Sequence, residues 1–246
     1  MPTPRIDASA RLIVALDLNS VQEAREMVQK LDGVVSFFKV GLTLQLARGV
    51  EDLIQSLIDS GKQVFLDYKY YDIPTTLRLA VKRAAERGVA FLTIHGSSSL
   101  MRAAVEGRTG SNLKVFAVTV LTAMDKADLL EMGYAHHEVK DLVTVRAKRA
   151  IDAGLDGVIA SGQEAALIKT FPGKLLVVTP GIRPDGYPED DQKRKTTPRQ
   201  AVQAGADYLV IGRPITDAPD PRSASQLIIA EMQEAFDAIR YTGVTE

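Results

Sequence analysis

The sequence predicts a single-domain (β/α)₈ barrel, the TIM-barrel class of α/β protein. Short apolar runs alternate with longer amphipathic stretches along the whole chain of 246 residues, and eight such pairs follow one another. The runs are apolar throughout, which is typical of parallel strands that are buried on both faces. Eight strand–helix pairs in about 250 residues indicate a closed parallel barrel. No linker-like segment divides the chain, so residues 1–246 are treated as one domain.

The expected elements alternate in order along the chain. The predicted strands are residues 11–17, 36–41, 63–69, 90–96, 114–121, 156–161, 175–181 and 207–214. The predicted helices are residues 20–33, 46–61, 75–88, 98–110, 125–154, 162–173, 197–206 and 223–240. Ser20 is a suitable N-cap and Gly33 a suitable end for the first helix. The fifth helical region is interrupted near "GYAHH", where His136 and His137 are expected at the surface.

An open, doubly wound sheet is the alternative architecture. Such a sheet usually has fewer strands and a glycine-rich turn after the first one. The stretch "ALDLNS" after the first predicted strand contains no glycine. The sequence therefore favours the barrel.

Composition excludes several classes of function. The chain has no cysteine, which rules out cysteine zinc sites, thiol nucleophiles and redox pairs and is compatible with a cytoplasmic location. The 30 basic residues nearly balance the 31 acidic ones, so there is no electrostatic argument for a nucleic-acid partner. The N-terminal apolar run is broken by Asp17 and resembles neither a signal peptide nor a membrane span. We therefore expect a cytoplasmic protein that binds neither nucleic acid nor membrane.

Polar residues gather where the predicted strands end, and this is the end at which TIM barrels carry their active sites. Side chains alternate along a strand, so Asp67 and Lys69 should share one face, with Asp17 and Lys39 on neighbouring strands. Buried charge is costly unless it is paired or functional. Alternating charges at successive strand ends therefore indicate a reaction centre rather than a solvated salt bridge. The further polar residues at predicted strand ends are His95, which we expect to be a packed histidine, Thr122, Ser161, Thr179 and Arg213.

The chemistry of this charged group follows from its lysines. A lysine flanked by carboxylates stays protonated, which makes it a poor Schiff-base nucleophile but a suitable proton donor. A divalent metal between the carboxylates would collide with Lys69. We therefore expect neither a metal nor another cofactor.

The second half of the chain supplies a predicted anion site. Arg183 follows the seventh predicted strand, and Gly212 and Arg213 end the eighth. Loops after strands 7 and 8 frequently bind phosphate in this fold, and an arginine fork recognises phosphate oxygens well. The long polar loop 182–197 between them is either a lid or an ordinary surface loop.

An ordered set of motifs resembles one known family over nearly the whole chain. The stretch "DYKYYDIPTT" is similar to the D-x-K-x-x-D-I-P-x-T signature of the orotidine 5′-phosphate decarboxylases. The stretches "LIVALD", "FKVG", "TVLT", "TPGIRP" and "IGRPI" fit the same family in the same order. The resemblance implies decarboxylation of orotidine 5′-monophosphate to uridine 5′-monophosphate and CO₂ in pyrimidine biosynthesis. It also implies a cofactor-free homodimer with shared active sites.

The resemblance also implies a catalytic role for four residues. Lys69 would donate the proton to C6 of the pyrimidine, and Asp67 would face the departing carboxylate. Lys39 and Asp72 would complete an alternating charge network, with Asp72 arriving from the other subunit. Two local departures, Tyr70-Tyr71 before Asp72 and "HGSSS" at residues 95–99, remove no charged group.

The implied substrate contacts extend over the whole site. Asp17 and Lys39 would hold ribose hydroxyls, with Thr76 joining from the partner chain. Thr122 would contact the pyrimidine, and Gln192 would link the base to the phosphate. The complete implied substrate-binding set is Asp17, Lys39, Asp67, Asp72, Ile73, Thr76, Thr122, Pro180, Arg183, Gln192, Gly212 and Arg213.

Two other functions remain open at this point. Magnesium-dependent sugar-phosphate lyases and synthases of related barrels share D-x-K-x-x-D. They need an acidic metal ligand near the second strand, where this chain has Lys39. The other alternative is a non-catalytic protein that binds a phosphorylated ligand, and the intact charge array with Gln192 argues against it.

Overall fold

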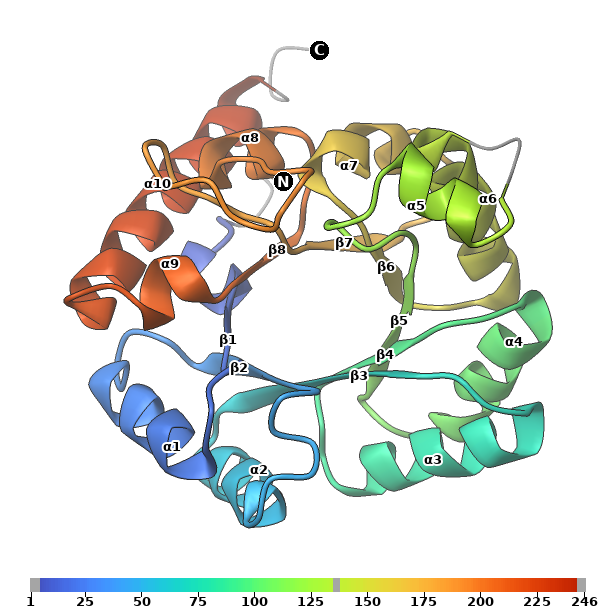
Figure 1. Cartoon of the computed structure of the whole chain (residues 1–246), viewed down its shortest axis with the longest axis horizontal. Coiled ribbons are helices and arrows are strands. Elements are labelled where there is room, and N and C mark those ends of the chain that lie inside the picture. The colour runs from blue at the N-terminus through green and yellow to red at the C-terminus, as the bar shows by residue number, and fades with distance from the viewer. Residues whose placement is uncertain (1–4, 135–137, 243–246) are drawn as a thin grey trace.

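The computed structural model describes residues 5–134 and 138–242. Eight parallel strands close into one barrel, β1 to β8, in sequence order. The first strand pairs with the last, since Leu12 lies opposite Leu209 in parallel register. The helices surround this ring of strands (Figure 1). The predicted single-domain TIM barrel is confirmed.

The strands and helices alternate with short connections. The strands are β1 Leu12–Ala15, β2 Phe37–Gly41, β3 Gln63–Tyr70, β4 Phe91–Ile94, β5 Lys114–Val118, β6 Gly157–Ile159, β7 Leu176–Thr179 and β8 Tyr208–Ile211. The helices are the 3₁₀ turn η1 Ala8–Arg11 and α1 Val21–Lys30, α2 Val50–Asp59, α3 Pro74–Glu86, α4 Ser98–Gly107, α5 Lys126–Glu131, α6 Val139–Ala153, α7 Gly162–Lys169, α8 Pro198–Gln203, α9 Arg213–Thr216 and α10 Pro221–Thr242. None of the helices in the described ranges is long and apolar enough to cross a membrane.

Local signals explain where several helices begin and end. Ser20 caps α1 as predicted, because its hydroxyl accepts a hydrogen bond from the amide of Glu23. The region predicted as one interrupted helix is two helices, α5 and α6. The expectation for His136 and His137 falls outside the described residues. The eighth predicted strand was too long, because β8 ends at Ile211 and Arg213 begins the short helix α9.

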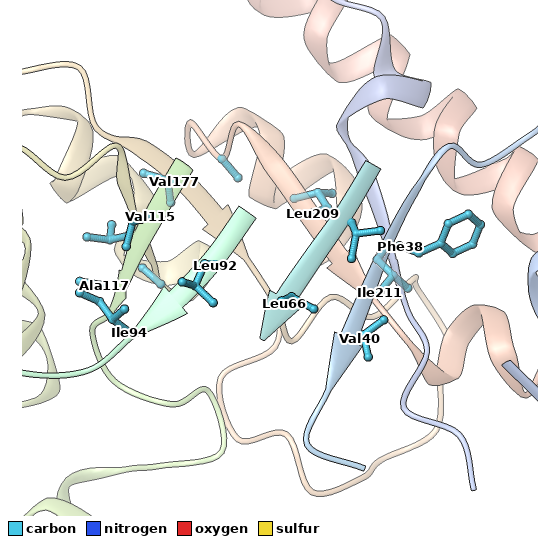
Figure 2. Packing of buried hydrophobic residues seen from close by; sticks show 14 of the residues in the cluster. Phe38, Val40, Leu66, Leu92, Ile94, Val115, Ala117, Val177, Leu209 and Ile211 are labelled. Carbon is cyan, nitrogen blue, oxygen red and sulfur yellow. The ribbon is translucent and has the colours of Figure 1, made fainter. Parts of the chain in front are cut away.

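Two buried apolar layers hold the barrel together. The outer layer joins the strands to the helices, and Figure 2 shows some of its side chains, among them Leu92 and Ile94. The inner layer is a smaller cluster that includes Phe37, Phe65 and Phe91. The rings of Phe37 and Phe91 lie 4.8 Å apart, edge to face. This aromatic layer fills the barrel interior, so a cavity can form only beyond it.

Candidate active site

Four charged side chains at the carboxyl ends of β1 to β3 form one alternating chain. The Nζ of Lys39 lies 2.8 Å from Oδ1 of Asp17 and 3.5 Å from Oδ2 of Asp67. The Nζ of Lys69 lies 3.0 Å from the same oxygen of Asp67. The Lys39 and Asp67 side chains are only 7% and 17% exposed. The structure thus brings these four residues together, as predicted.

The backbone of β3 departs from regular geometry at Lys69. Its φ of 49° is the only positive value at a non-glycine residue in the described ranges. The pairing of β3 with β4 also shifts register between Leu66 and Tyr70. A left-handed conformation costs a non-glycine residue on the order of 1–2 kcal/mol. Simple strand alternation, on which the sequence prediction relied, therefore does not fully describe how Lys69 reaches the cavity.

Thr93 on β4 connects this unusual backbone to the carboxylate beside it. Its hydroxyl accepts a hydrogen bond from the amide of Lys69 at 3.0 Å and donates one to Oδ1 of Asp67 at 2.9 Å. Burial alone would raise the pKa of Asp67, but the charges of Lys39 and Lys69 and the hydrogen bonds from Lys69 and Thr93 outweigh it. The pKa of Asp67 is lowered below its ordinary value, so this carboxylate is charged at neutral pH.

Gly41 makes room for the pair formed by Asp17 and Lys39. A Cβ atom at this position would lie 2.5 Å from Oδ1 of Asp17 and 2.8 Å from Nζ of Lys39. Both distances are shorter than real Cβ contacts allow. A side chain at position 41 would displace the ends of these two side chains, so the glycine lets the ion pair keep its present geometry.

The opposite side of the site carries two arginines. Arg183 follows β7 and is buried, and its Nε donates to Oδ2 of Asp190 at 2.8 Å. Arg213 follows β8, lies 3.2 Å from the same oxygen of Asp190, and also pairs with Asp191. Both guanidinium groups therefore contact carboxylates from the 182–197 loop. This is the chemistry with which arginine binds an anion.

The 182–197 loop is fastened to the loop after β5 by side chains near its end. Thr122 donates to Oε1 of Gln192 at 2.6 Å. The Nζ of Lys193 lies 2.8 Å from Asp125, the N-cap of α5. Arg194 is buried and donates to the carbonyls of Val120 and Leu121 in the loop after β5, and it also pairs with Glu164 on α7 at 2.7 Å. Gln192 is thus held over the site by its neighbours in the chain.

A single cavity of about 590 Å³ connects the charged group to the two arginines. Its size is in the range of small-ligand sites in proteins. The predicted residues that line it are Asp17, Lys39, Asp67, Lys69, Thr122, Pro180, Arg183, Gln192, Gly212 and Arg213. Three polar residues at predicted strand ends, His95, Ser161 and Thr179, are not among its lining residues.

Comparison with known proteins places the chain in a family. The sequence pattern of the orotidine 5′-phosphate decarboxylase / HUMPS family matches residues 10–228. The chain belongs to this family. The predicted resemblance is therefore confirmed over almost its whole length.

Individual relatives in the decarboxylase family cover nearly the same length. The orotidine 5′-phosphate decarboxylase of Nitrobacter winogradskyi is 54% identical over 230 residues, which are 93% of this chain and 95% of the relative. The corresponding protein of Caulobacter sp. is 48% identical over 92% of this chain and 99% of its own. A crystal structure of the decarboxylase from Lactobacillus acidophilus superposes with a TM-score of 0.79 at 34% identity, covering 91% of this chain and 99% of that one.

Three residues of the family signature lie outside the cavity of their own chain. Asp72 and Ile73 belong to the connection between β3 and α3, and Thr76 lies in the first turn of α3. None of the three is among the lining residues. Oδ1 of Asp72 accepts a hydrogen bond from the adjacent amide of Ile73 at 2.6 Å. The Ile73 side chain is 65% exposed, and its neighbour Tyr71 is 72% exposed. A single chain therefore does not bring these residues to its own charged group.

Several residues that contact the charged group or the two arginines were not predicted from the sequence. Thr93 was not among the predicted site residues. Its lone hydroxyl is conspicuous in the apolar strand "FLTI", but its bonding partners on β3 cannot be read from the sequence. Gly41 ends the motif "FKVG", but its steric role depends on how close the side chains of Asp17 and Lys39 lie to it. Asp190 and Asp191 lie in the predicted lid, where nothing in the composition singles them out as partners of the arginines.

The surroundings of His95 fit the expectation that it is a packed residue. Burial lowers the pKa of its imidazole, and the positive charges of Arg146 and Lys69 lower it further. The ring is therefore neutral at pH 7. A neutral, half-buried histidine outside the cavity lining fits a packing role.

Proposed function

We propose that the chain decarboxylates orotidine 5′-monophosphate to uridine 5′-monophosphate and CO₂, with Lys69 as the proton donor to C6. One observation carries the proposal. Within a single cavity, an alternating lysine–carboxylate group faces two arginines that bind acidic partners. The name of the 54% identical relative in the same family supports the same reaction.

The reaction uses the charged group as follows. The bond between C6 and the substrate carboxylate breaks, its electron pair stays on C6, and CO₂ leaves. The ammonium of Lys69 then delivers a proton to C6. Asp67 is charged and lies 3.0 Å from that ammonium. Its negative charge disfavours the carboxylate of the bound substrate more than a transition state in which that charge has moved into the ring.

The remaining cavity residues bind the rest of the nucleotide. Asp17 and Lys39 are placed to hold ribose hydroxyls, and Thr122 and Gln192 to contact the base. Arg183 and Arg213, with Pro180 and Gly212 beside them, bind the phosphate in place of their present carboxylate partners. The single cavity that these residues share and the order of the family motifs support the assignments.

A second copy of the chain completes the site in this proposal. Asp72, on the connection between β3 and α3, and Thr76, in the first turn of α3, do not line their own cavity. Tyr71 and Ile73 on the same connection are mostly exposed. Exposed apolar side chains next to a functional carboxylate are suited to burial between subunits. In a two-fold dimer each chain would supply Asp72, Ile73 and Thr76 to its partner's cavity.

The magnesium-dependent sugar-phosphate branch is the competing function, since the family description includes it. That chemistry needs a metal ligand near the end of β2. Here the ammonium of Lys39 lies between the carboxylates of Asp17 and Asp67. A metal cation between the two carboxylates would be repelled by the ammonium of Lys39. This repulsion favours the cofactor-free reaction.

The deciding assay follows the loss of orotidylate absorbance with purified protein in the presence of EDTA. We expect full activity after exhaustive chelation, because Lys39 and Lys69 supply the positive charge that a metal would otherwise provide. Uridine 5′-monophosphate should be the nucleotide product. Orotidylate turnover restored only by added Mg²⁺ would overturn the cofactor-free reaction. No turnover with or without Mg²⁺ would favour the sugar-phosphate branch instead.

Replacement of Arg213 should affect substrate recognition through the phosphate. We expect Arg213→Ala to lower kcat/KM for the nucleotide by roughly 10- to 100-fold, the effect of about 1.5–3 kcal/mol for a charged hydrogen bond. The same variant should leave kcat/KM for unphosphorylated orotidine nearly unchanged. Steady-state kinetics with both substrates provide the measurement.

Arg199→Ala is the matched control for this experiment. Arg199 pairs with Glu234 on α10, outside the cavity lining. Arg199→Ala should therefore leave kcat/KM unchanged for both the nucleotide and unphosphorylated orotidine. If Arg213→Ala lowers kcat/KM for the nucleotide and for the nucleoside by the same factor, the assignment of Arg213 to the phosphate is wrong.

A further inference from the structure

We infer that Thr93 is a positioning residue for this reaction, because one buried hydroxyl fixes both the backbone of Lys69 and the carboxylate of Asp67. The inference rests on the proposed function, since it concerns the proton donor of that reaction. Thr93 is fully buried and is not part of the cavity lining. It therefore acts through its two neighbours and not on the substrate.

The orientation of Thr93 follows from the strand that carries it. Leu92 and Ile94 belong to the outer apolar layer, and both are labelled in Figure 2. Phe91 belongs to the inner cluster. Because side chains alternate along a strand, Thr93 points into the barrel on the same side as Phe91. It is a polar group in the interior, next to the charged cluster.

Both hydrogen-bonding functions of this hydroxyl are used. Its proton is donated to Oδ1 of Asp67 at 2.9 Å, and its oxygen accepts from the amide of Lys69 at 3.0 Å. The other oxygen of Asp67 faces the ammonium groups of Lys39 and Lys69. Both oxygens of this carboxylate are therefore held, which fixes its rotation. Few side chains other than a hydroxyl could donate and accept through one atom.

The contact to Lys69 matters because of the backbone at this residue. Lys69 has the left-handed φ of 49° in a stretch where the pairing of β3 with β4 is interrupted. The partly buried amide of Lys69 therefore finds its partner in a side chain. Without that partner the amide would be unsatisfied, and the chain would gain by relaxing toward an ordinary φ. Such a relaxation would move the ammonium away from Asp67 and from C6.

Small displacements of a proton donor have large kinetic effects. Proton transfer needs the heavy atoms within about 2.6–3.2 Å of each other. A misplacement of about 1 Å by a distant substitution can reduce the rate roughly 100-fold. Thr93 is thus expected to influence the chemical step, while the phosphate and ribose contacts at the rest of the cavity stay intact.

Thr93→Val is the main test, because valine keeps the shape of threonine and removes only the hydroxyl. We expect kcat for orotidine 5′-monophosphate to fall roughly 10- to 100-fold, with KM changed by less than about threefold. Thr93→Ser keeps the hydroxyl and loses a methyl group. It should recover kcat to within roughly threefold of wild type.

Thr119→Val is the matched control. Thr119 is equally buried and is not itself a lining residue, although its neighbours Val118 and Val120 are. Its hydroxyl donates to the backbone carbonyl of Ile159 at 2.7 Å and not to any of the four charged residues. This variant should lower the melting temperature without lowering kcat. If Thr93→Val fails to fold, Thr93→Ala and Thr93→Ser form a second pair, because they differ from each other only in the hydroxyl.

Two results would overturn the inference while leaving the proposed function intact. One is a folded Thr93→Val protein with kcat within about threefold of wild type. The other is an equal loss in the variants with and without the hydroxyl, which would show that only volume matters. A wild-type protein inactive on orotidine 5′-monophosphate would overturn the proposed function and this inference with it. The wild-type measurement thus separates the two failures.

Discussion

Lys69→Ala should reduce kcat at least about 1000-fold, within the range of roughly 10²–10⁴ for a general acid. The substitution removes the proton donor and one of the two ammonium groups that contact Asp67. Substrate binding should change far less, because the arginines lie at the other end of the cavity. Rapid-quench kinetics would give the rate, and titration with uridine 5′-monophosphate would give the affinity.

Two controls make this result specific to Lys69. Lys82→Ala removes an exposed lysine of α3 and should have wild-type kinetics. Lys69→Arg keeps the positive charge but not the proton-donating ammonium, and it should be almost as slow as Lys69→Ala. A Lys69→Ala protein within tenfold of the wild-type rate would remove Lys69 from the chemical step.

Mixing two nearly inactive variants should restore activity if Asp72 acts across a dimer. Lys69→Ala and Asp72→Asn each damage every site of their own homodimer. In a mixed dimer, both lesions would fall in one site, and the other site would contain intact Lys69 and intact Asp72. Random exchange of equal amounts should therefore restore roughly a quarter of the wild-type sites. Steady-state activity after subunit exchange measures this fraction.

The structure offers a matched negative control for the mixing experiment. Asp67 and Lys69 contact each other within one chain, so Asp67→Asn and Lys69→Ala lie in cis. A mixed dimer of these two variants has one lesion in each site, and no activity should return. Absence of recovery with Asp72→Asn, once native mass spectrometry shows that subunits exchange, would overturn the shared-site proposal.

The barrel could be predicted from the sequence because its signal is spread over many residues. Each buried parallel strand is an apolar run, and eight of them recur at regular spacing, so errors of a few residues at the ends do not change the topology. The prediction failed at β8 for a local reason. "VIGRP" continues the apolar run, but Gly212 takes φ −108° and ψ −104° and the chain turns into α9.

The charged part of the site could also be predicted, since Asp17, Lys39, Asp67 and Lys69 all stand at strand ends. The parts that could not be predicted depend on contacts between distant residues. Nothing in "FLTI" indicates that Thr93 bonds to a residue on the preceding strand. The left-handed conformation of Lys69 runs against the preference of its residue type, so local propensity predicts the opposite.

The fastening of the 182–197 loop has a consequence for the entropy of ligand binding. The backbone of Arg183 donates to Thr196 and that of Arg194 to Thr122, so the base and the far half of the loop are already ordered. The exposed residues of the loop are 185, 186, 188, 189, 191 and 193, and four of these six lie within the short segment 185–189. Ordering a residue costs roughly 1–2 kcal/mol in backbone entropy. On ligand binding, this cost could apply only to the short segment 185–189, because the rest of the loop is already hydrogen-bonded. Little of the contact energy of the phosphate is therefore spent on organising the loop, and its main cost is the exchange of the arginines' present pairs with Asp190 and Asp191.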